Sequence, residues 1–175
     1  MPRCEDVAVS RKEVLRTDRL VLTSWLPPDV DRLLEIHSDE ETMRFVREGR
    51  PETRLETAAL IDQYIAEDAR LGVTKWRLVD RQDQLVGRAG FGARRDGREL
   101  GYTIRRELWG QGMATEIAAG LVKWHRTHAA RTPLWAYVAS GNSASSRVLE
   151  KTGFDPIGSE QHHRVTCQLF RLPDV

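Results

Sequence analysis

Two glycines lie two residues apart in the segment LWGQGMATEIAAGL, which runs from residue 108 to residue 121. Gly110 and Gly112 follow a predicted strand, and small and apolar residues at helical spacing begin directly after them. A helix start has unpaired backbone N–H groups at the positive end of the helix dipole, and glycine lets a ligand approach the backbone closely. The segment therefore suggests a binding site for an anion such as phosphate, with a plain strand-to-helix turn as the alternative.

Two well-known phosphate-binding motifs do not match this bend. A P-loop continues from its last glycine with Lys and then Ser or Thr, whereas Gly112 is followed by Met113 and Ala114. A dinucleotide-binding fingerprint needs a third small residue where this chain has Thr115, and an acid near residue 130, where the chain has none. Both motifs are excluded.

The spacing of apolar residues predicts the elements that would position this bend. The predicted strands cover residues 18–25, 74–80, 84–92, 98–104, 133–138, 154–160 and 165–172, and the predicted helices cover residues 27–38, 38–46, 54–70, 112–127 and 142–153. This order favours an α+β fold, a mixed, mostly antiparallel sheet of six to seven strands flanked by helices. We expect residues 1–14 to form a flexible tail and residues 15–175 to form a single domain.

Local signals mark several helix ends. Ser38 with Glu41 and Thr53 with Glu56 have the spacing of capping boxes. In the segment NSASSRVLEKTG, Asn142 is a natural N-cap and Gly153 a natural residue for the C-terminal end.

Composition narrows the classes of function. The chain has 175 residues, 30% of them charged, and a net charge of +1, which argues against a nucleic-acid partner. No apolar run approaches the roughly 18 residues of a membrane span, and the N-terminal segment lacks the apolar region of a signal peptide. Cys4 and Cys167 are the only cysteines, so we expect no structural disulfide and a cytoplasmic location.

Two motifs together carry a family resemblance. The segment GYTIRRELWGQGMATE, followed by NSASSRVLEKTGF, resembles the GNAT N-acetyltransferases. The opening LRTDRLVLTSW is similar to the branch that contains the ribosomal-protein N-terminal (RimJ/RimL-like) acetyltransferases. The resemblance covers roughly residues 15–172 and implies the GNAT acyl-CoA N-acyltransferase fold, with acetyl-CoA as co-substrate and no metal.

The resemblance also implies which residues bind the cofactor. The backbone amides of the bend would hold the pyrophosphate, and the preceding strand would pair with the pantetheine arm. Asn142 and Ser145 match residues near the cofactor, the second of them near its sulfur. The implied cofactor-binding residues are Tyr102, Thr103, Ile104, Gly110, Gln111, Gly112, Met113, Ala114, Thr115, Asn142 and Ser145.

The chain departs from the family pattern at catalytic positions. Leu149 stands where many relatives carry a tyrosine as general acid, so Ser145 becomes the candidate proton donor, with helix capping as the alternative role. Arg164 stands where ribosomal-protein members carry a glutamate as candidate base. Glu99 is the first candidate for the base, with a solvated strand-end acid as its alternative reading. The other candidates are Glu160, His162 and His163.

The resulting hypothesis is an N-acetyltransferase that moves an acetyl group to a primary amine by direct attack in a ternary complex. The acceptor would be a protein N-terminus or a small molecule, because the change at Arg164 weakens the case for a ribosomal protein. The alternative from another class is an acyl-CoA-binding regulatory module without turnover. The last predicted hairpin could pair its edge with a second copy, so a homodimer is a further expectation.

Overall fold

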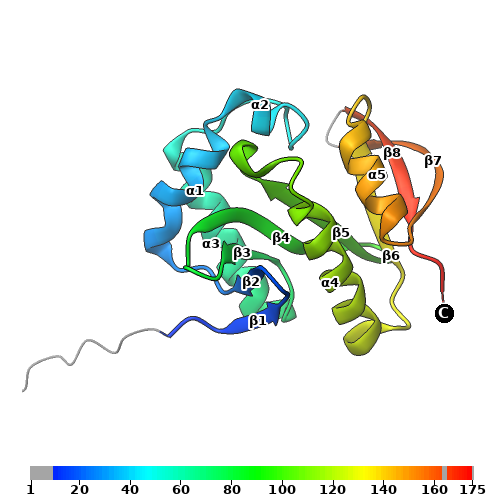
Figure 1. The fold of residues 1–175 in the computed structure, drawn as a ribbon, viewed down its shortest axis with the longest axis horizontal. Helices are drawn as coiled ribbons and strands as arrows, with labels where there is room; N and C mark the ends of the chain where they lie inside the picture. Colours follow the sequence, from blue (N-terminus) through cyan, green and yellow to red (C-terminus); the bar gives the residue numbers. More distant parts are fainter. Residues whose placement is uncertain (1–9, 163–164, 175) are drawn as a thin grey trace, which may run out of the picture.

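The computed structural model describes residues 10–162 and 165–174, and within them a single sheet crosses the whole molecule (Figure 1). Its strand order is β1-β2-β3-β4-β5-β6-β8-β7. The strands are β1 (Glu13–Arg16), β2 (Leu20–Thr23), β3 (Lys75–Asp80), β4 (Leu85–Arg94), β5 (Gly97–Ile104), β6 (Leu134–Ala139), β7 (Asp155–His162) and β8 (Val165–Arg171). Every neighbouring pair is antiparallel except β5 and β6, which confirms the predicted α+β class.

Helices cover both faces of this sheet. They are α1 (Val30–His37), α2 (Glu40–Met43), α3 (Arg54–Leu71), α4 (Met113–Ala129) and α5 (Ser143–Lys151), with short 3-10 turns η1 (Pro27–Asp29) and η2 (Arg106–Leu108). Strand β2 shows how the faces divide, because Leu20 and Leu22 enter the core under α4 and α5, whereas Val21 enters the core under α1 and α3. The alternation of a strand thus feeds two separate hydrophobic cores. No helix in the described ranges is long and apolar enough to cross a membrane.

Strand β1 corrects the predicted count of six to seven strands to eight. Its four residues, EVLR, pair antiparallel with β2 but are too few and too charged to show an alternating pattern. The strand begins at Glu13, two residues ahead of the expected domain start at Leu15. The first nine residues of the expected tail lie outside the described residues.

Helix ends follow the predicted signals at two of three places. Thr53 Oγ1 accepts from the backbone of Glu56, whose carboxylate accepts from Thr53 N at 2.7 Å, which confirms that capping box. The Ser38 box is wrong, because Ser38 N–H still donates to Leu34 O of α1 and Asp39 caps α2 instead. Helix α2 then ends at Met43 rather than at residue 46. The predicted caps of α5 are confirmed below and by the positive φ of Gly153, +93°.

Strands β5 and β6 separate soon after they meet. Only Arg98 with Leu134 and Glu99 with Trp135 pair in register, although β5 continues to Ile104 and β6 to Ala139. Helix α4 forms the crossover that joins these two parallel strands (Figure 1). Beyond Glu99, the β5 backbone therefore offers an unpaired edge toward the space between the strands.

Candidate active site

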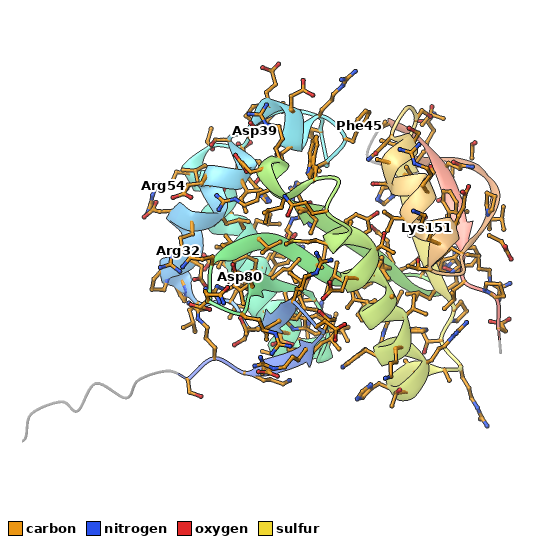
Figure 2. The ribbon with its side chains drawn as sticks, in the orientation of Figure 1. Arg32, Asp39, Phe45, Arg54, Asp80 and Lys151 are labelled. Atoms are coloured by element: carbon orange, nitrogen blue, oxygen red, sulfur yellow. The ribbon has the colours of Figure 1, made fainter. Side chains whose placement is uncertain are left out.

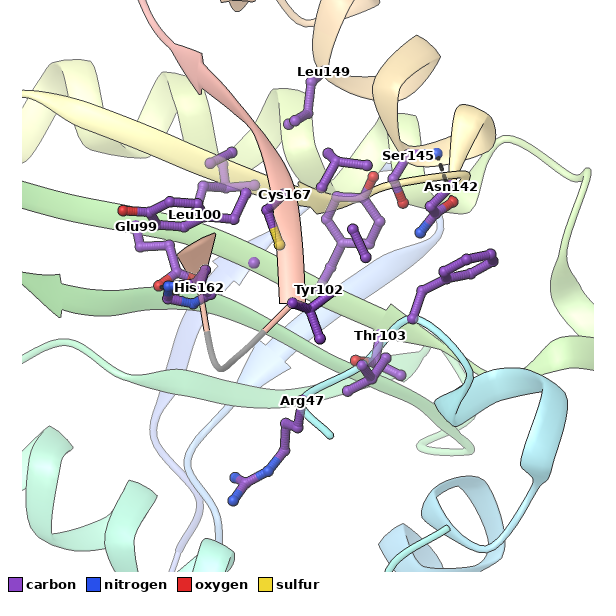
Figure 3. A pocket seen from close by; sticks show the side chains of 18 of the residues that line it. Arg47, Glu99, Leu100, Tyr102, Thr103, Asn142, Ser145, Leu149, His162 and Cys167 are labelled. Carbon is purple, nitrogen blue, oxygen red and sulfur yellow. Dashed lines mark hydrogen bonds and ion pairs between the residues drawn. The ribbon is translucent and has the colours of Figure 1, made fainter. Parts of the chain in front are cut away.

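A cavity of about 180 Å³ lies where β5 and β6 diverge. Its wall on one side is the β5 segment 99–103, and on the other side it is the β6 segment 136–139 with the start of α5. Figure 3 shows side chains from β5, α5 and the strands β7 and β8 around this space. The cavity thus brings together residues that are far apart in the sequence.

The glycine bend lies at the far end of β5 and begins α4. Gly110 and Gly112 have φ of +74° and +78°, in the left-handed region that L side chains rarely adopt. A Cβ added at Gly110 would meet no atom within 4 Å, and one added at Gly112 would meet only Arg19 Nη2 at 3.6 Å. Open space in front of both glycines fits a ligand that approaches the backbone.

The N-terminus of α4 has unpaired donors. Side chains of Asp39, Thr53 and Asn142 cap the starts of α2, α3 and α5, whereas within the described part of the chain no side chain caps α1, which continues directly from η1, or α4 at Gly112. The first N–H groups of a helix have no partner inside the helix, so those of α4 are available to an anion. A plain turn would explain the two positive φ angles, whereas a bound anion would also use the open N–H groups at the first turn of the 17-residue helix α4.

Contacts of two side chains, Trp109 and Arg19, fix the shape of the bend. Trp109 Nε1 donates to Ile104 O at 2.7 Å, which closes the loop at the end of β5. Arg19 Nη1 donates to Gln111 O at 2.9 Å, and Arg19 Nε pairs with Glu116 Oε2 at 2.6 Å. The bend is therefore held before any ligand binds, which reduces the ordering cost of binding.

Tyr102 and Ser145 face each other across the cavity. Figure 3 shows the phenol of Tyr102 pointing from β5 toward the Ser145 side chain at the start of α5. Burial raises the pKa of the Tyr102 phenol, and the Ser145 hydroxyl offsets only part of that rise. The Tyr102 oxygen is buried, and among the described residues no group, Ser145 included, meets both the distance and the angle of a hydrogen bond to it. A protonated phenol with a free proton is a candidate donor inside the cavity.

Asn142 has a structural role at the rim of the same cavity. Its side-chain oxygen accepts from Ser145 N at 3.2 Å and so caps α5, as the sequence predicted. This contact orients the first turn of α5, which carries the Ser145 hydroxyl. Asn142 also lines the cavity, so its amide group remains within reach of a ligand there.

Glu99, Lys75 and His162 form a group of neighbouring ionisable side chains at the other end of the cavity. Glu99 Oε1 lies 3.4 Å from Lys75 Nζ, and Glu99 Oε2 lies 3.7 Å from His162 Nε2. The His162 ring stacks on Tyr137, with 4.0 Å between ring centroids and 5° between ring planes. The fold thus places two candidate bases, Glu99 and His162, next to each other.

The remaining base candidates lie elsewhere. Glu160 does not line the cavity; it accepts from the Tyr137 hydroxyl at 2.9 Å and lies 3.7 Å from Arg94 Nη2. His163 and Arg164 fall outside the described residues. Glu99 and His162 are therefore the candidates that the geometry favours.

Cys167 also lines the cavity, on β8. Burial raises the pKa of its thiol, and the nearby charge of Glu99 raises it further. A thiol that resists ionisation is a poor nucleophile. Its thiol therefore does not suit the role of a nucleophile in this cavity.

The fold divides the residues proposed from the sequence into two groups. Glu99, Tyr102, Thr103, Asn142 and Ser145 line one cavity. Ile104 is buried in the core at 6% exposure, and the bend from Gly110 to Thr115 lies outside the cavity lining. A ligand that uses both groups must run along the edge of β5, from the bend to the cavity.

Sequence reasoning missed three side chains in this cavity. The resemblance assigned Tyr102 a role through its backbone only, and it assigned none to Lys75 or Arg88. Each of the three lies within a predicted strand, on β3, β4 or β5. The spacing of apolar residues identifies a strand but does not tell whether one of its side chains lines a cavity or packs in the core. Strand pairing alone brings them together.

Comparisons with known proteins match this architecture. A family model described as an acetyltransferase (GNAT) domain matches residues 19–155. The uncharacterized N-acetyltransferase YoaA of Bacillus subtilis is 28% identical over 150 residues, which cover 83% of this chain and 84% of the relative.

Two solved structures share the fold. A GNAT-family acetyltransferase from Bacillus anthracis superposes with a TM-score of 0.79 at 20% identity, covering 91% of this chain and 98% of that one. The ribosomal L7/L12 alpha-N-protein acetyltransferase RimL, in complex with coenzyme A, superposes with a TM-score of 0.73 at 16% identity, covering 91% and 97%.

Proposed function

The chain belongs to the acetyltransferase (GNAT) domain family, and from that premise we propose that it moves the acetyl group of acetyl-CoA to a primary amine. The observation that carries the proposal is the cavity between β5 and β6 at one end of an unpaired strand edge, with an uncapped helix start at the other. The acceptor is a small-molecule amine or a protein N-terminus.

Acetyl-CoA fits the two groups of residues along β5. The backbone N–H groups from Gly110 to Thr115 would hold the pyrophosphate, because they are unpaired and face open space. The free edge of β5 would hydrogen-bond the pantetheine amides through the backbone of Tyr102 and the N–H of Ile104, whereas the backbone of Thr103 faces β4. Bound acetyl-CoA supplies the acetyl group as a thioester, whose carbonyl carbon is open to attack by an amine.

Glu99 and His162 would remove the proton from the attacking amine. An α-amine has a pKa near ~8 and a lysine-type amine near ~10.4, so both are largely protonated at neutral pH and need a base. His162 Nε2 lies 3.7 Å from Glu99 Oε2, and Lys75 fixes the other carboxylate oxygen from 3.4 Å. In this role the carboxylate of Glu99 would stabilise the positive charge that His162 gains when it takes up the proton.

Tyr102 and Ser145 would supply a proton to the departing sulfur. The new C–N bond forms as the C–S bond breaks, and the electron pair of that bond stays on sulfur. The Tyr102 phenol is kept protonated by burial and points at Ser145, which matches the family serine near the sulfur. This pair would replace the tyrosine that the sequence lacks at Leu149.

The experiment that tests the proposal is acetyl-CoA binding by calorimetry, followed by CoA release with a panel of amines. Gly112→Trp would fill the space in front of the bend and should abolish binding. Gly72→Trp is the matched control, because Gly72 has a similar φ of +68° with nothing within 4 Å of an added Cβ, and does not line the cavity.

The possible results distinguish an acetyltransferase from a binding module and from a plain turn. Binding that is lost only in Gly112→Trp, together with CoA release on an amine, supports the proposal. Binding without release on any amine would favour the acyl-CoA-binding module. If the folded wild-type chain bound no acetyl-CoA, the bend would be a plain turn and the proposal would fail.

A further inference from the structure

Arg88 is a buried arginine with most of its donors unused. It lies on β4, is 5% exposed and lines the cavity. Its Nε donates to His37 Nε2 at 3.3 Å, and its guanidinium lies 5.9 Å from the centre of the Tyr64 ring. A guanidinium has five N–H donors, yet the two terminal nitrogens of Arg88 make no hydrogen bond or ion pair with residues 10–162 or 165–174.

Its neighbour on the adjacent strand shows what a buried arginine ordinarily requires. Arg77 of β3 pairs in register with Arg88 and is 0% exposed. Arg77 Nη1 lies 2.7 Å from Asp83 Oδ1, and Arg77 Nε lies 3.5 Å from Asp29 Oδ1. Two carboxylates thus neutralise Arg77, whereas no carboxylate in the described ranges comes within ion-pair distance of Arg88. A buried charge without a counter-ion is costly, so this difference needs a cause.

A chain of contacts holds Arg88 in place but puts no carboxylate within ion-pair distance of its guanidinium among the described residues. The nearby carboxylate of Glu52 is occupied by His37 Nδ1 at 2.8 Å and by Arg47 Nε at 3.2 Å. His37 accepts from Arg88 at Nε2, so a neutral ring must carry its proton on Nδ1 and donate it to Glu52. Burial lowers the pKa of His37, and the charge of Arg88 adds to that lowering, which favours the neutral ring. The positive charge of Arg88 therefore stays available to the cavity.

A second unused donor lies beside it. Thr103 on β5 is the register partner of Arg88, so the two side chains emerge on the same face of the sheet. Thr103 is 5% exposed, lines the same cavity, and its hydroxyl has no partner in the described part of the chain. Two neighbouring residues that line the cavity and have unused donors make a receptor for an oxyanion.

We propose that Arg88 and Thr103 form an oxyanion-binding subsite for the acceptor, which is therefore a primary amine that also carries a carboxylate or phosphate group. This inference rests on the proposed function, because it names the class of amine that the cavity accepts. The planar guanidinium fork suits a two-oxygen contact, and the threonine hydroxyl donates to one of those oxygens. The Glu99–His162 pair would then receive the amine end of the same molecule.

Paired amines provide the first test. Each amino acid is assayed for CoA release beside its primary amide, and ethanolamine phosphate is assayed beside ethanolamine. Rates within a pair are compared at equal concentrations of unprotonated amine, because the anionic group also changes the pKa of the amine. Dipeptides with an acidic first residue are assayed beside forms whose C-terminal carboxylate is amidated. A preference that survives amidation comes from the acidic side chain, and one that is lost comes from the C-terminal carboxylate. We expect kcat/KM to be at least tenfold higher for the anionic member of the preferred pair.

Variants assign that preference to the subsite. Arg88→Met should erase the preference by lowering kcat/KM at least tenfold for the anionic amine, while it changes the neutral amine less than threefold. Arg88→Lys keeps the charge and should retain part of the preference, and Thr103→Val should reduce it by a smaller factor. Arg32→Met is the charge-matched control, because Arg32 is exposed on α1, away from the cavity (Figure 2).

A binding measurement keeps this test independent of turnover. In protein labelled with 15N-arginine, the Nε–Hε signal of Arg88 is followed by NMR while acetate or inorganic phosphate is added. We expect a saturable shift for Arg88, no shift for Arg77, and no saturable binding in Arg88→Met. If acetyl-CoA binding or transfer fails but the Arg88 signal still shifts, the proposed function is wrong, whereas anion binding at the subsite is supported. Equal use of paired amines by the wild type, or an Arg88 signal that never responds, would overturn the subsite.

Discussion

The phenol of Tyr102 on β5 points at the hydroxyl of Ser145 on α5, inside the cavity that opens between β5 and β6 (Figure 3). The two residues are 43 positions apart in the chain, and no sequence motif links them. Leu149, where family members carry a tyrosine, is 2% exposed and lines the same cavity. A phenol therefore reaches this cavity from a strand rather than from the helix.

Tyr102→Phe removes only the phenolic oxygen and should lower kcat about 100-fold or more, because one proton donor typically contributes on the order of 10²-fold or more. The KM for acetyl-CoA should stay within a factor of about three, because the backbone of β5 is unchanged. Steady-state kinetics at several acetyl-CoA concentrations give both values.

Ser145→Ala is the companion variant in this test. If the two hydroxyls act together, the double variant should be much less impaired than the product of the two single effects. A rise in KM with an unchanged kcat in Tyr102→Phe would mean that the phenol only helps to bind the cofactor.

The second prediction concerns the base. Glu99→Gln and His162→Gln should each lower kcat at pH 7 by about 10²-fold, in the range expected of a general base. Activity should recover as the pH rises toward the pKa of the acceptor, near ~8 for an α-amine and ~10.4 for a lysine-type amine, because the amine then needs no base. Glu160→Gln is the control, since Glu160 lies outside the cavity lining and contacts Tyr137 and Arg94. A loss that persists at all pH values would indicate a structural role for Glu99 or His162.

The α+β class could be predicted from the sequence because its signals are local. A run of apolar residues that are buried on both faces of the sheet marks β2, and apolar residues at helical spacing such as Ile117 and Leu121 mark α4. Strand β1 could not be found in this way, because four residues with two charged ends give no period to detect. Its place in the sheet comes from pairing with β2, which is a tertiary contact.

The same limit applies to the candidate site. The bend at Gly110 and Gly112 was visible because glycine has a distinctive backbone role, and the structure gives both residues positive φ. Arg88 could not be identified as a site residue from the sequence, because a single arginine within a strand has no distinctive pattern until its contacts are known. Its missing counter-ion and its neighbour Thr103 depend on strand register and on the packing of α1, neither of which the sequence spacing encodes.

The third prediction concerns the contact between α4 and the turn before β2. Glu116 accepts from Thr17 Oγ1 at 2.6 Å and from Arg19 N at 2.8 Å, and it pairs with Arg19 Nε. Burial raises the pKa of Glu116, but these hydrogen bonds outweigh it and leave the pKa below its ordinary value. Glu116→Gln should therefore lower the free energy of unfolding at pH 7 by about 1–2 kcal/mol.

The lowered pKa of Glu116 in the folded state determines how that loss of stability depends on pH. A carboxylate with a lowered pKa in the folded state stabilises the protein above the unfolded value of about 4.3, and this contribution disappears as the pH falls through the folded value. The difference between wild type and Glu116→Gln in urea unfolding should thus shrink below about pH 4.3. A constant difference across that range would show that the charge of Glu116 is not the cause.

The fourth prediction concerns the buried ring of His37, which is 0% exposed. Burial lowers its pKa, the hydrogen bond to Glu52 raises it in part, and the charge of Arg88 lowers it further, so the folded value lies below the ordinary one. The unfolded chain then takes up a proton near pH 6.5 that the folded chain refuses, and stability should fall as the pH drops below about 6.5. One such group contributes at most about 1.4 kcal/mol per pH unit.

His37→Gln tests this directly, because an amide can still donate toward Glu52 and accept from Arg88 but does not titrate. Between about pH 6.5 and 5, urea unfolding of the variant should show a shallower loss of stability than wild type. Some loss should remain, because burial also lowers the pKa of His125, which is 3% exposed. Equal slopes in His37→Gln and wild type would mean that His37 takes up its proton in the folded state as readily as in the unfolded one.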